Sequence, residues 1–425
     1  MTARGAAMPG ASEILVSDRL QRLEHWREAA ERLADLDALA SRAAWESLEH
    51  YVGIALRQTL ASSVQRLRTL IDALGQRIRT FQADPAAVPL EAFTEVRQAY
   101  LRTEATLDFF SDALATRAHP RTAALLRACD HLATRSMAEA LAPLGREAPA
   151  TLTYLDKGLG ASILKAGLRL YDPQSENPVA AIKIVRHNLV RPTSLLHEAG
   201  HHVFHMLRWN EALARALRAT LAPVSDDTAE LWASWASEVA ADAFAFVHSG
   251  FAQLAPMRDV VDGSDDDVFR IFPGDPHPPP WLRVLLGVEM CRRAYGRGPW
   301  DALEVAWLAE HPLERAPEGA HDLFERSRCA LPDLVEVMLY RDYPAFGGGS
   351  LARLLDPQRV SPRALAQLES LLGGRTFKPY VAWNEAIRIL ALTGYRAAAD
   401  PPRAREAAAR QEQFMFALGG LQRAA

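Results

Sequence analysis

The feature that most constrains the fold is a series of apolar residues at helical spacing in the first third of the chain. Within residues 14–142, apolar side chains recur at steps of three and four, with Arg, Gln and Glu between them. We expect these stripes to form a helical bundle or helical hairpins packed on the rest of the protein; an exposed groove for a protein partner is the alternative. The three stripes are Leu23, Trp26, Ala30, Leu33 and Leu36; Leu56, Leu60, Val64, Leu67, Ile71, Leu74 and Ile78; and Phe93, Val96, Tyr100, Leu107 and Phe110.

The character of the sequence changes after the Ala-Pro-Leu-Gly segment that ends at Gly145. Three short runs rich in β-formers follow, at residues 151–155, 167–171 and 179–186, and the proline-rich residues 172–178 suit a turn between the last two. We therefore predict a mainly α fold with a small antiparallel β-sheet. Three regions are expected: an N-terminal helical region (1–145), a core region that contains the sheet (146–300) and a C-terminal helical region (301–425).

Composition excludes several classes of function. The chain has 425 residues and a net charge of −4, so neither nucleic acid nor an anionic membrane is an expected partner. The sequence has no apolar run long enough for a membrane span and no signal-peptide pattern at its start. Its three cysteines lie far apart, which indicates reduced thiols and a cytoplasmic protein.

The segment His-Glu-Ala-Gly-His at 197–201 predicts a metal site on a helix that starts near Ser194 and runs through His205. Residues four apart lie on one helix face, so His197 and His201 can present both imidazoles to one Zn²⁺ ion. Glu198 is rotated by about 100° around the same helix, beside the ligands, where it can act as general base toward a zinc-activated water.

The motif alone is short, and a chain with 13 histidines can contain it by chance on a helix that binds nothing. A second pair of residues supports the metal site. Glu238 and Asp242 lie four apart on a helix expected at about 227–248, which is rich in Ala, Trp and Phe. Burying two carboxylates without partners would cost several kcal/mol. We expect Glu238 to be the third zinc ligand and Asp242 to accept the free ring N–H of a ligand histidine.

Two histidines and one glutamate leave a fourth position open, which is typical of a catalytic zinc site. His202 and His205 are nearby spare donors, and we expect them to support or pack around the site without binding zinc. One zinc per chain is the only cofactor predicted.

These motifs resemble those of the gluzincins, metallopeptidases that combine an HExxH helix with a downstream glutamate helix. The matching pieces are HEAGHHVFH at 197–205 and SEVAADAFAF at 237–246. The segment HPPPWLRV at 277–284 is similar to a motif of the CAAX-prenyl and membrane heat-shock endopeptidases, whose membrane helices this chain lacks. The resemblance implies a zincin-like α+β core, and it implies that His277 stabilises the oxyanion and that Arg283 helps to fix the cleft.

The resemblance also implies that residues 179–186, just before the active helix, form an edge strand that pairs with extended substrate. A histidine in a proline-rich loop suits an oxyanion donor, although it can equally fix a turn. Tyr340, Tyr343 and Tyr380 are alternative donors, but no motif connects them to the zinc.

The sequence therefore predicts a zinc peptidase, expected to be an endopeptidase, that hydrolyses peptide or protein substrates without a covalent intermediate. Two alternatives remain. One is a specialised protease that acts on a single protein partner, recognised through the flanking helices. The other is a non-catalytic scaffold with a structural zinc, whose N-terminal helices bind a partner.

Overall fold

The computed structural model describes residues 10–84, 87–156, 162–164, 179–272, 274–373 and 379–420. The protein is mainly α-helical, as predicted. Its contacts divide the described residues into two compact units, 10–118 with Val179, and 119–164 with 180–420. None of the helices formed by the described residues combines the length and apolar character of a membrane span.

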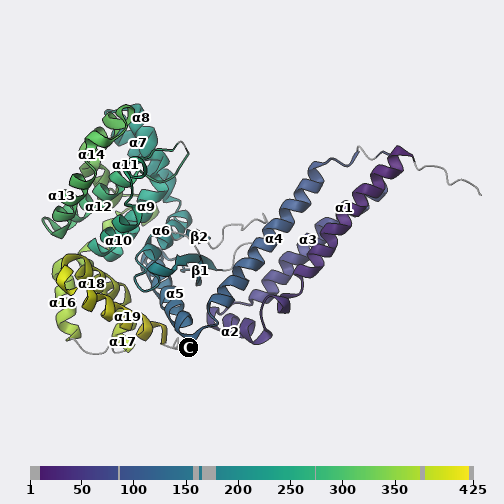
Figure 1. Cartoon of the computed structure of the whole chain (residues 1–425), viewed down its shortest axis with the longest axis horizontal. Coiled ribbons are helices and arrows are strands. Elements are labelled where there is room, and N and C mark those ends of the chain that lie inside the picture. Colours follow the sequence, from purple (N-terminus) through teal and green to yellow (C-terminus); the bar gives the residue numbers. More distant parts are fainter. Residues whose placement is uncertain are drawn as a thin grey trace, which may run out of the picture. The chain divides into compact units, whose positions relative to one another are not determined.

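The first unit is a helical bundle. It contains α1 (Ala11–Leu33), α2 (Arg42–Val52), α3 (Leu56–Thr80) and α4 (Glu91–Thr116), and α1, α3 and α4 run side by side (Figure 1). The predicted stripes form its core, which confirms the helical periodicity. Buried members of that core are Leu23, Ala30, Leu67, Ile71, Leu74, Ile78, Phe93 and Val96.

The second unit contains a three-stranded sheet of β1 (Thr151–Asp156), β2 (Ser162–Leu164) and β3 (Ala180–Val185) in the order β1-β3-β2. β2, which was not among the predicted strands, pairs with β3 antiparallel, but β1 pairs with β3 parallel. The prediction of a wholly antiparallel sheet is therefore wrong. In the sequence, β1 and β3 are far enough apart for the crossover connection that a parallel pair requires.

β3 is the central strand of this sheet, because both of its edges are hydrogen-bonded to neighbours. Its side chains on both faces are largely buried, as is usual for a strand that is covered on two sides. The prediction that residues 179–186 form an open edge for substrate is therefore wrong. The predicted strand at 167–171 and the turn at 172–178 lie outside the described residues.

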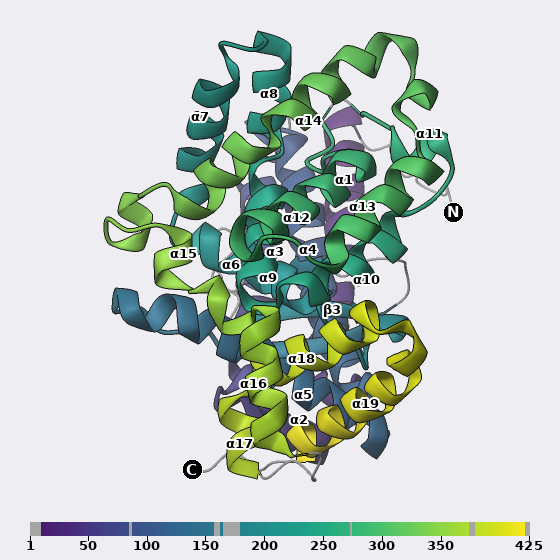
Figure 2. The ribbon, with the colours of Figure 1, turned by 90° about the vertical axis from the view of Figure 1, so that its left-hand side faces the viewer.

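Helices from the beginning and from the end of the second unit's sequence pack around the sheet. α5 (Pro120–Leu141) packs on β1, where buried Asp130 accepts hydrogen bonds from the Thr153 backbone N–H (2.6 Å) and hydroxyl (2.7 Å). α18 (Ala386–Ala399) and α19 (Ala404–Gly420) lie beside each other and share one core with α5, with α10 (Phe251–Val261) next to α18 (Figure 2). α5 belongs to the expected N-terminal region and α18 and α19 to the expected C-terminal region, and their contacts join all three to the sheet in one unit.

The candidate site lies on α6 (Ser194–Met206) and α9 (Ala236–Ser249), with α12 (Pro280–Tyr295) beside α9. The single helix predicted for 227–248 is broken at Trp235 into α8 (Asp226–Ser234) and α9. The remaining α-helices are α7 (Trp209–Leu221), α11 (Asp265–Val268), α13 (Pro299–Glu310), α14 (His321–Val335), α15 (Leu351–Leu354), α16 (Pro362–Leu372) and α17 (Pro379–Asn384).

Candidate metal centre

α6 and α9 pack directly against each other, and Gly200 sets how closely they approach. A Cβ atom at Gly200 would lie 2.7 Å from the Cβ of Phe244 and 3.2 Å from the Cα of Ala241. Because one of these atoms belongs to the backbone of α9, the contact cannot be relieved by turning a side chain. The glycine within the His-Glu-Ala-Gly-His segment therefore brings the two helices, and the residues that they carry, together.

Replacing Gly200 with Ala should push α6 away from α9. We expect a loss of stability of about 1–3 kcal/mol, typical of overpacking, and weaker metal binding because the ligands sit on both helices. Denaturant unfolding and zinc titration would measure the two effects. Gly319→Ala is the matched control, since a Cβ there meets nothing within 4 Å. Equal behaviour of the two variants would contradict this explanation.

The structure brings the three predicted ligands into one cluster. His197 Nε2 and His201 Nε2 lie 3.1 Å apart, and each is 3.2 Å from an oxygen of Glu238. Two atoms bound about 2.0–2.1 Å from one ion at tetrahedral angles lie about 3.3 Å apart, so these separations suit a shared Zn²⁺. All three residues are buried or nearly so.

The hydrogen bonding of the Glu238 carboxylate provides a second test of whether a metal ion fits between these residues. Its Oε2 is buried and makes no hydrogen bond within the described part of the chain, although two imidazole nitrogens lie 3.2–3.3 Å away. A buried carboxylate oxygen left in this state is costly. A cation shared by Glu238, His197 and His201 would satisfy this oxygen and both Nε2 atoms, so the residues fit a metal ion.

Asp242 and Arg283 orient His197 from the side away from Glu238. Asp242 Oδ1 lies 2.8 Å from His197 Nδ1, and Arg283 donates to both Asp242 oxygens at 2.6 and 2.8 Å. Arg283 Nη2 is also 3.4 Å from Nδ1, but the shorter contact to the carboxylate decides that Nδ1 carries the proton. His197 Nε2 thereby faces Glu238 and His201.

Neighbouring charges raise the pKa of His197 and lower the pKa of Asp242. Burial alone would lower the pKa of His197, but the carboxylates of Asp242 and Glu238 outweigh burial and raise it to about 9. Burial alone would raise the pKa of Asp242, yet the positive charges of Arg283 and His197 hold it well below its usual range. Metal binding must therefore displace a proton from His197.

Ser237 and Asn210 are site residues that the sequence analysis missed. Ser237 Oγ lies 3.3 Å from His201 Nδ1 and accepts a hydrogen bond from Asn210 Nδ2 at 3.3 Å. This contact fixes the second ring nitrogen of His201 as Asp242 does for His197. The position of Ser237 next to Glu238 was the only available signal, and Asn210 on α7 had none.

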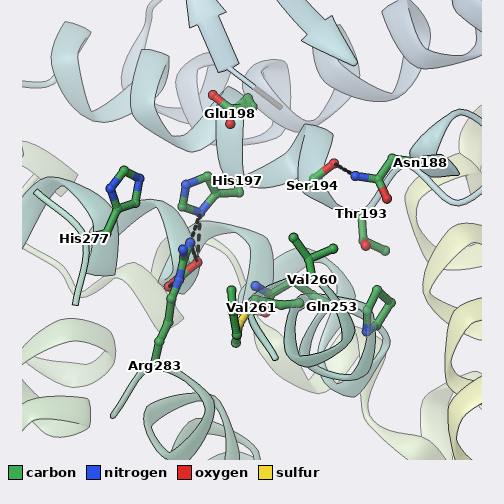
Figure 3. Close-up of a pocket in the computed structure, with 13 residues that line it drawn as sticks. Asn188, Thr193, Ser194, His197, Glu198, Gln253, Val260, Val261, His277 and Arg283 are labelled. Atoms are coloured by element: carbon green, nitrogen blue, oxygen red, sulfur yellow. Dashed lines mark hydrogen bonds and ion pairs between the residues drawn. The ribbon is translucent and has the colours of Figure 1, made fainter. Parts of the chain in front are cut away.

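Glu198 lies beside the cluster and lines a cavity of about 170 Å³ together with His197, His277 and Arg283. Figure 3 shows Glu198 and Arg283 on opposite sides of His197, with His277 to one side. The Glu198 side chain is buried, and burial raises its pKa, partly offset by the positive charges of His197 and His201. Glu198 is outside the group of His197, His201 and Glu238 that could hold a metal ion.

His277 lies at the site on the loop before α12. Its Nε2 is 3.3 Å from Glu238 Oε2, and its Nδ1 is 2.7 Å from Asp275 Oδ1. Half of the side chain is exposed, so it can reach a molecule in the cavity. Asp275, which the sequence analysis did not single out, holds the ring and also accepts from the His277 backbone N–H at 3.0 Å.

The other residues considered from the sequence are not in the cluster. His202 is buried and His205 is exposed, and neither joins the ligand group. Tyr343 donates its hydroxyl to the Val337 carbonyl at 3.0 Å, and Tyr380 is 80% exposed. Tyr340 stacks under Arg293, and none of these tyrosines lines the cavity at His197. Cys129, Cys291 and Cys329 form no disulfide in the part of the chain that the structure describes.

No protein-family description, curated protein or solved structure gave a significant match to this chain. Function can therefore be inferred only from the residues of the site itself.

Proposed function

We propose that this protein is a zinc-dependent hydrolase of peptide bonds, built on a zincin-like core. One observation carries the proposal. The nitrogen atoms of His197 and His201 and the carboxylate of Glu238 converge to 3.1–3.2 Å, with the carboxylate Glu198 beside them in a cavity. Three protein ligands and an adjacent general base are the elements of a catalytic zinc site.

A zinc ion in this cluster would supply Lewis acidity, which polarises a carbonyl and lowers the pKa of water toward about 7. The role of the protein is to fix which ring nitrogen of His197 and of His201 carries the proton. Asp242 and Ser237 accept the outer ring protons of His197 and His201, so that both Nε2 atoms point to the ligand position with free lone pairs.

Glu198 is the proton carrier in this proposal. Its raised pKa makes it a better base than an ordinary glutamate, and its position beside the ligands places it next to the attacking water. It accepts the proton of that water and passes it to the leaving amine nitrogen. No covalent bond to the protein forms at any stage.

His277 is the donor that this proposal assigns to the oxyanion. Asp275 receives its Nδ1–H, which leaves Nε2 directed toward the ligand cluster. A hydrogen-bond donor at this position would stabilise a developing negative charge, a contact worth roughly 3–4 kcal/mol of barrier when the donor lies near 3 Å. The choice of a peptide as substrate rests on the gluzincin-like motifs.

Metal content tests the proposal most directly. We expect the purified protein to hold about one zinc per chain, to cleave an unstructured substrate such as casein, and to lose that activity when a chelator removes the metal. Adding Zn²⁺ back should restore cleavage. A zinc that leaves only on unfolding, in a protein that cleaves nothing, would favour the scaffold alternative.

A protease that acts on one protein partner is a second candidate, favoured by the separate helical unit. That unit has its own groove, lined by Trp26, Phe93 and Leu90 together with Arg22 and Arg97, and Leu90 is 60% exposed. Such a protease would leave casein intact and cleave only its partner. Deleting a side chain of the groove, as in Trp26→Ala, would then reduce cleavage of the partner.

A further inference from the structure

One wall of the cavity at His197 is formed by a single face of α10. Five residues of this helix line the cavity at positions i, i+3, i+4, i+7 and i+8, and four of them are apolar. Exposure falls along this face from 39% at Val260 to 5% at Gln253, so Gln253 lies at the deep end. Figure 3 shows Gln253 on the same side of the pocket as Val260 and Val261. The α10 wall consists of Gln253, Pro256, Met257, Val260 and Val261.

The Gln253 side chain ends in an amide that has no partner of its own. It makes no side-chain hydrogen bond within the described part of the chain. Its oxygen and nitrogen are nevertheless not among the unpaired polar atoms that are closed off from solvent. Because the residue is otherwise buried and lines the cavity, these accessible amide atoms face the cavity. A molecule bound there can therefore form hydrogen bonds with them.

Tight packing of α10 fixes the direction of this amide. Ala252 lies against Gly394 of α18, where an added Cβ would be 2.8 Å from the Cβ of Ala252. Leu254 lies against Gly287 of α12, where an added Cβ would be 2.6 Å from the Cδ1 of Leu254. Consecutive residues are separated by about 100° around a helix, so Gln253 points between these two contacts. α10 cannot rotate without disturbing one of them.

The lining of the cavity favours a neutral polar side chain as its ligand. Asp242 and Arg283 neutralise each other through contacts of 2.6 and 2.8 Å, and the α10 wall carries no charge. An unpaired charge buried against this wall would be costly. A wholly apolar side chain would cover the Gln253 amide and leave its donors and acceptor unpaired. A carboxamide, with one acceptor and two donors, complements both ends of Gln253.

We propose that the α10 wall receives the substrate side chain next to the bond that is cut, and that Gln253 selects a carboxamide side chain, that of glutamine or asparagine, at this position. The inference rests on the proposed peptidase function, because His197 and Glu198 line the same cavity. The apolar residues of the wall contact the stem of that side chain. Gln253 determines specificity and takes no part in the proton transfers of Glu198.

Peptide capture by the inactive full-length protein tests this inference without requiring cleavage. Immobilised Glu198→Gln protein, loaded with zinc, is incubated with a random hexapeptide library, and the bound peptides are sequenced by mass spectrometry. We expect glutamine and asparagine to be enriched about tenfold at one position over leucine, glutamate and lysine, the ratio expected for one or two hydrogen bonds.

Substitution of Gln253 in the same background should change this preference in a defined direction. Gln253→Met should replace the carboxamide preference by one for apolar side chains. Gln253→Glu, which keeps the size of the side chain, should shift the preference to lysine and arginine. Gln413→Glu, at an exposed position of α19, is the matched control and should retain the preference of the parent. Zinc content and thermal unfolding show whether each variant is folded.

The parent protein alone can overturn the inference, because a library that shows no carboxamide preference contradicts it even if the variants do not fold. An unchanged preference in folded Gln253→Met or Gln253→Glu would also overturn it. A carboxamide preference in the parent, with no cleavage of any peptide by the active protein, would instead count against the peptidase proposal and leave the assignment of the α10 wall in place.

Discussion

Glu198→Gln should retain about one zinc per chain and lose nearly all hydrolytic activity. The substitution keeps the size and shape of the side chain but removes its ability to accept a proton. The ligand atoms of His197, His201 and Glu238 are untouched. Proton transfer by a positioned side chain contributes roughly 10²–10⁴-fold to the rate, and we expect kcat to fall by a factor in this range. Zinc analysis and casein hydrolysis, run on the same preparation, measure both outcomes.

The substitution Glu198→Gln should not lower the free energy of unfolding of the metal-free protein. The pKa of Glu198 is raised in the folded state, so its ionised form is less favourable there than in the unfolded chain. The stability contributed by a protonated Glu198 is present at low pH and is lost as pH rises through the folded-state pKa. At neutral pH an uncharged Gln is therefore at least as stable.

Glu211→Gln, an exposed substitution of the same kind on α7, is the control and should leave activity unchanged. Normal hydrolysis by Glu198→Gln would contradict the assignment of Glu198 as general base. Loss of zinc from this variant would instead show that Glu198 takes part in holding the metal.

Of the substitutions considered, Asp242→Asn should cause the largest decrease in the free energy of unfolding. Asp242 is 2% exposed and receives two hydrogen bonds from Arg283, a guanidinium whose side chain is only 13% exposed. Removing one charge of a buried pair leaves the other uncompensated, which costs about 3–5 kcal/mol. Zinc affinity should fall by about 10–100-fold, because His197 loses the acceptor that fixes its ring. Denaturant unfolding followed by tryptophan fluorescence, and competition with a zinc indicator, give the two values.

The double variant Asp242→Asn with Arg283→Met separates these two effects. Replacing Arg283 by an apolar side chain removes the unpaired charge, so most of the lost stability should return. Zinc affinity should stay low, because the acceptor for His197 is still missing. Asp322→Asn, which breaks an exposed pair with Arg326 on α14, should change stability by less than about 1 kcal/mol. If the double variant were as unstable as the single one, the buried charge would not be the cause.

Several features could be predicted from the sequence because they depend on residues close together in the chain. The spacing of His197, Glu198 and His201 defines two neighbouring imidazoles and a carboxylate beside them on any helix, whatever surrounds it. The apolar stripes of α1, α3 and α4 likewise follow from helical periodicity, and they form the core of the first unit. The placement of Glu238 and Asp242 on an apolar helix indicated that both needed partners inside the protein.

Other features depended on which distant segments pack together. The local pattern of 180–185 predicts a strand but contains nothing to show that its neighbours are β1 and β2, so its central position could only come from the tertiary structure. Likewise, α8 and α9 read as one helix from their composition, and the break at Trp235 appears only in the packed protein.

The sequence by itself determined a helical protein in which His197 and His201 share one helix face and Glu198 lies beside them. The tertiary structure decided which groups gather around them: Glu238 across the contact at Gly200, Arg283 behind Asp242, and Ser237 and Asn210 beside His201. The physical reason is that spacing along a helix is set by the backbone, whereas the approach of two helices depends on every side chain between them.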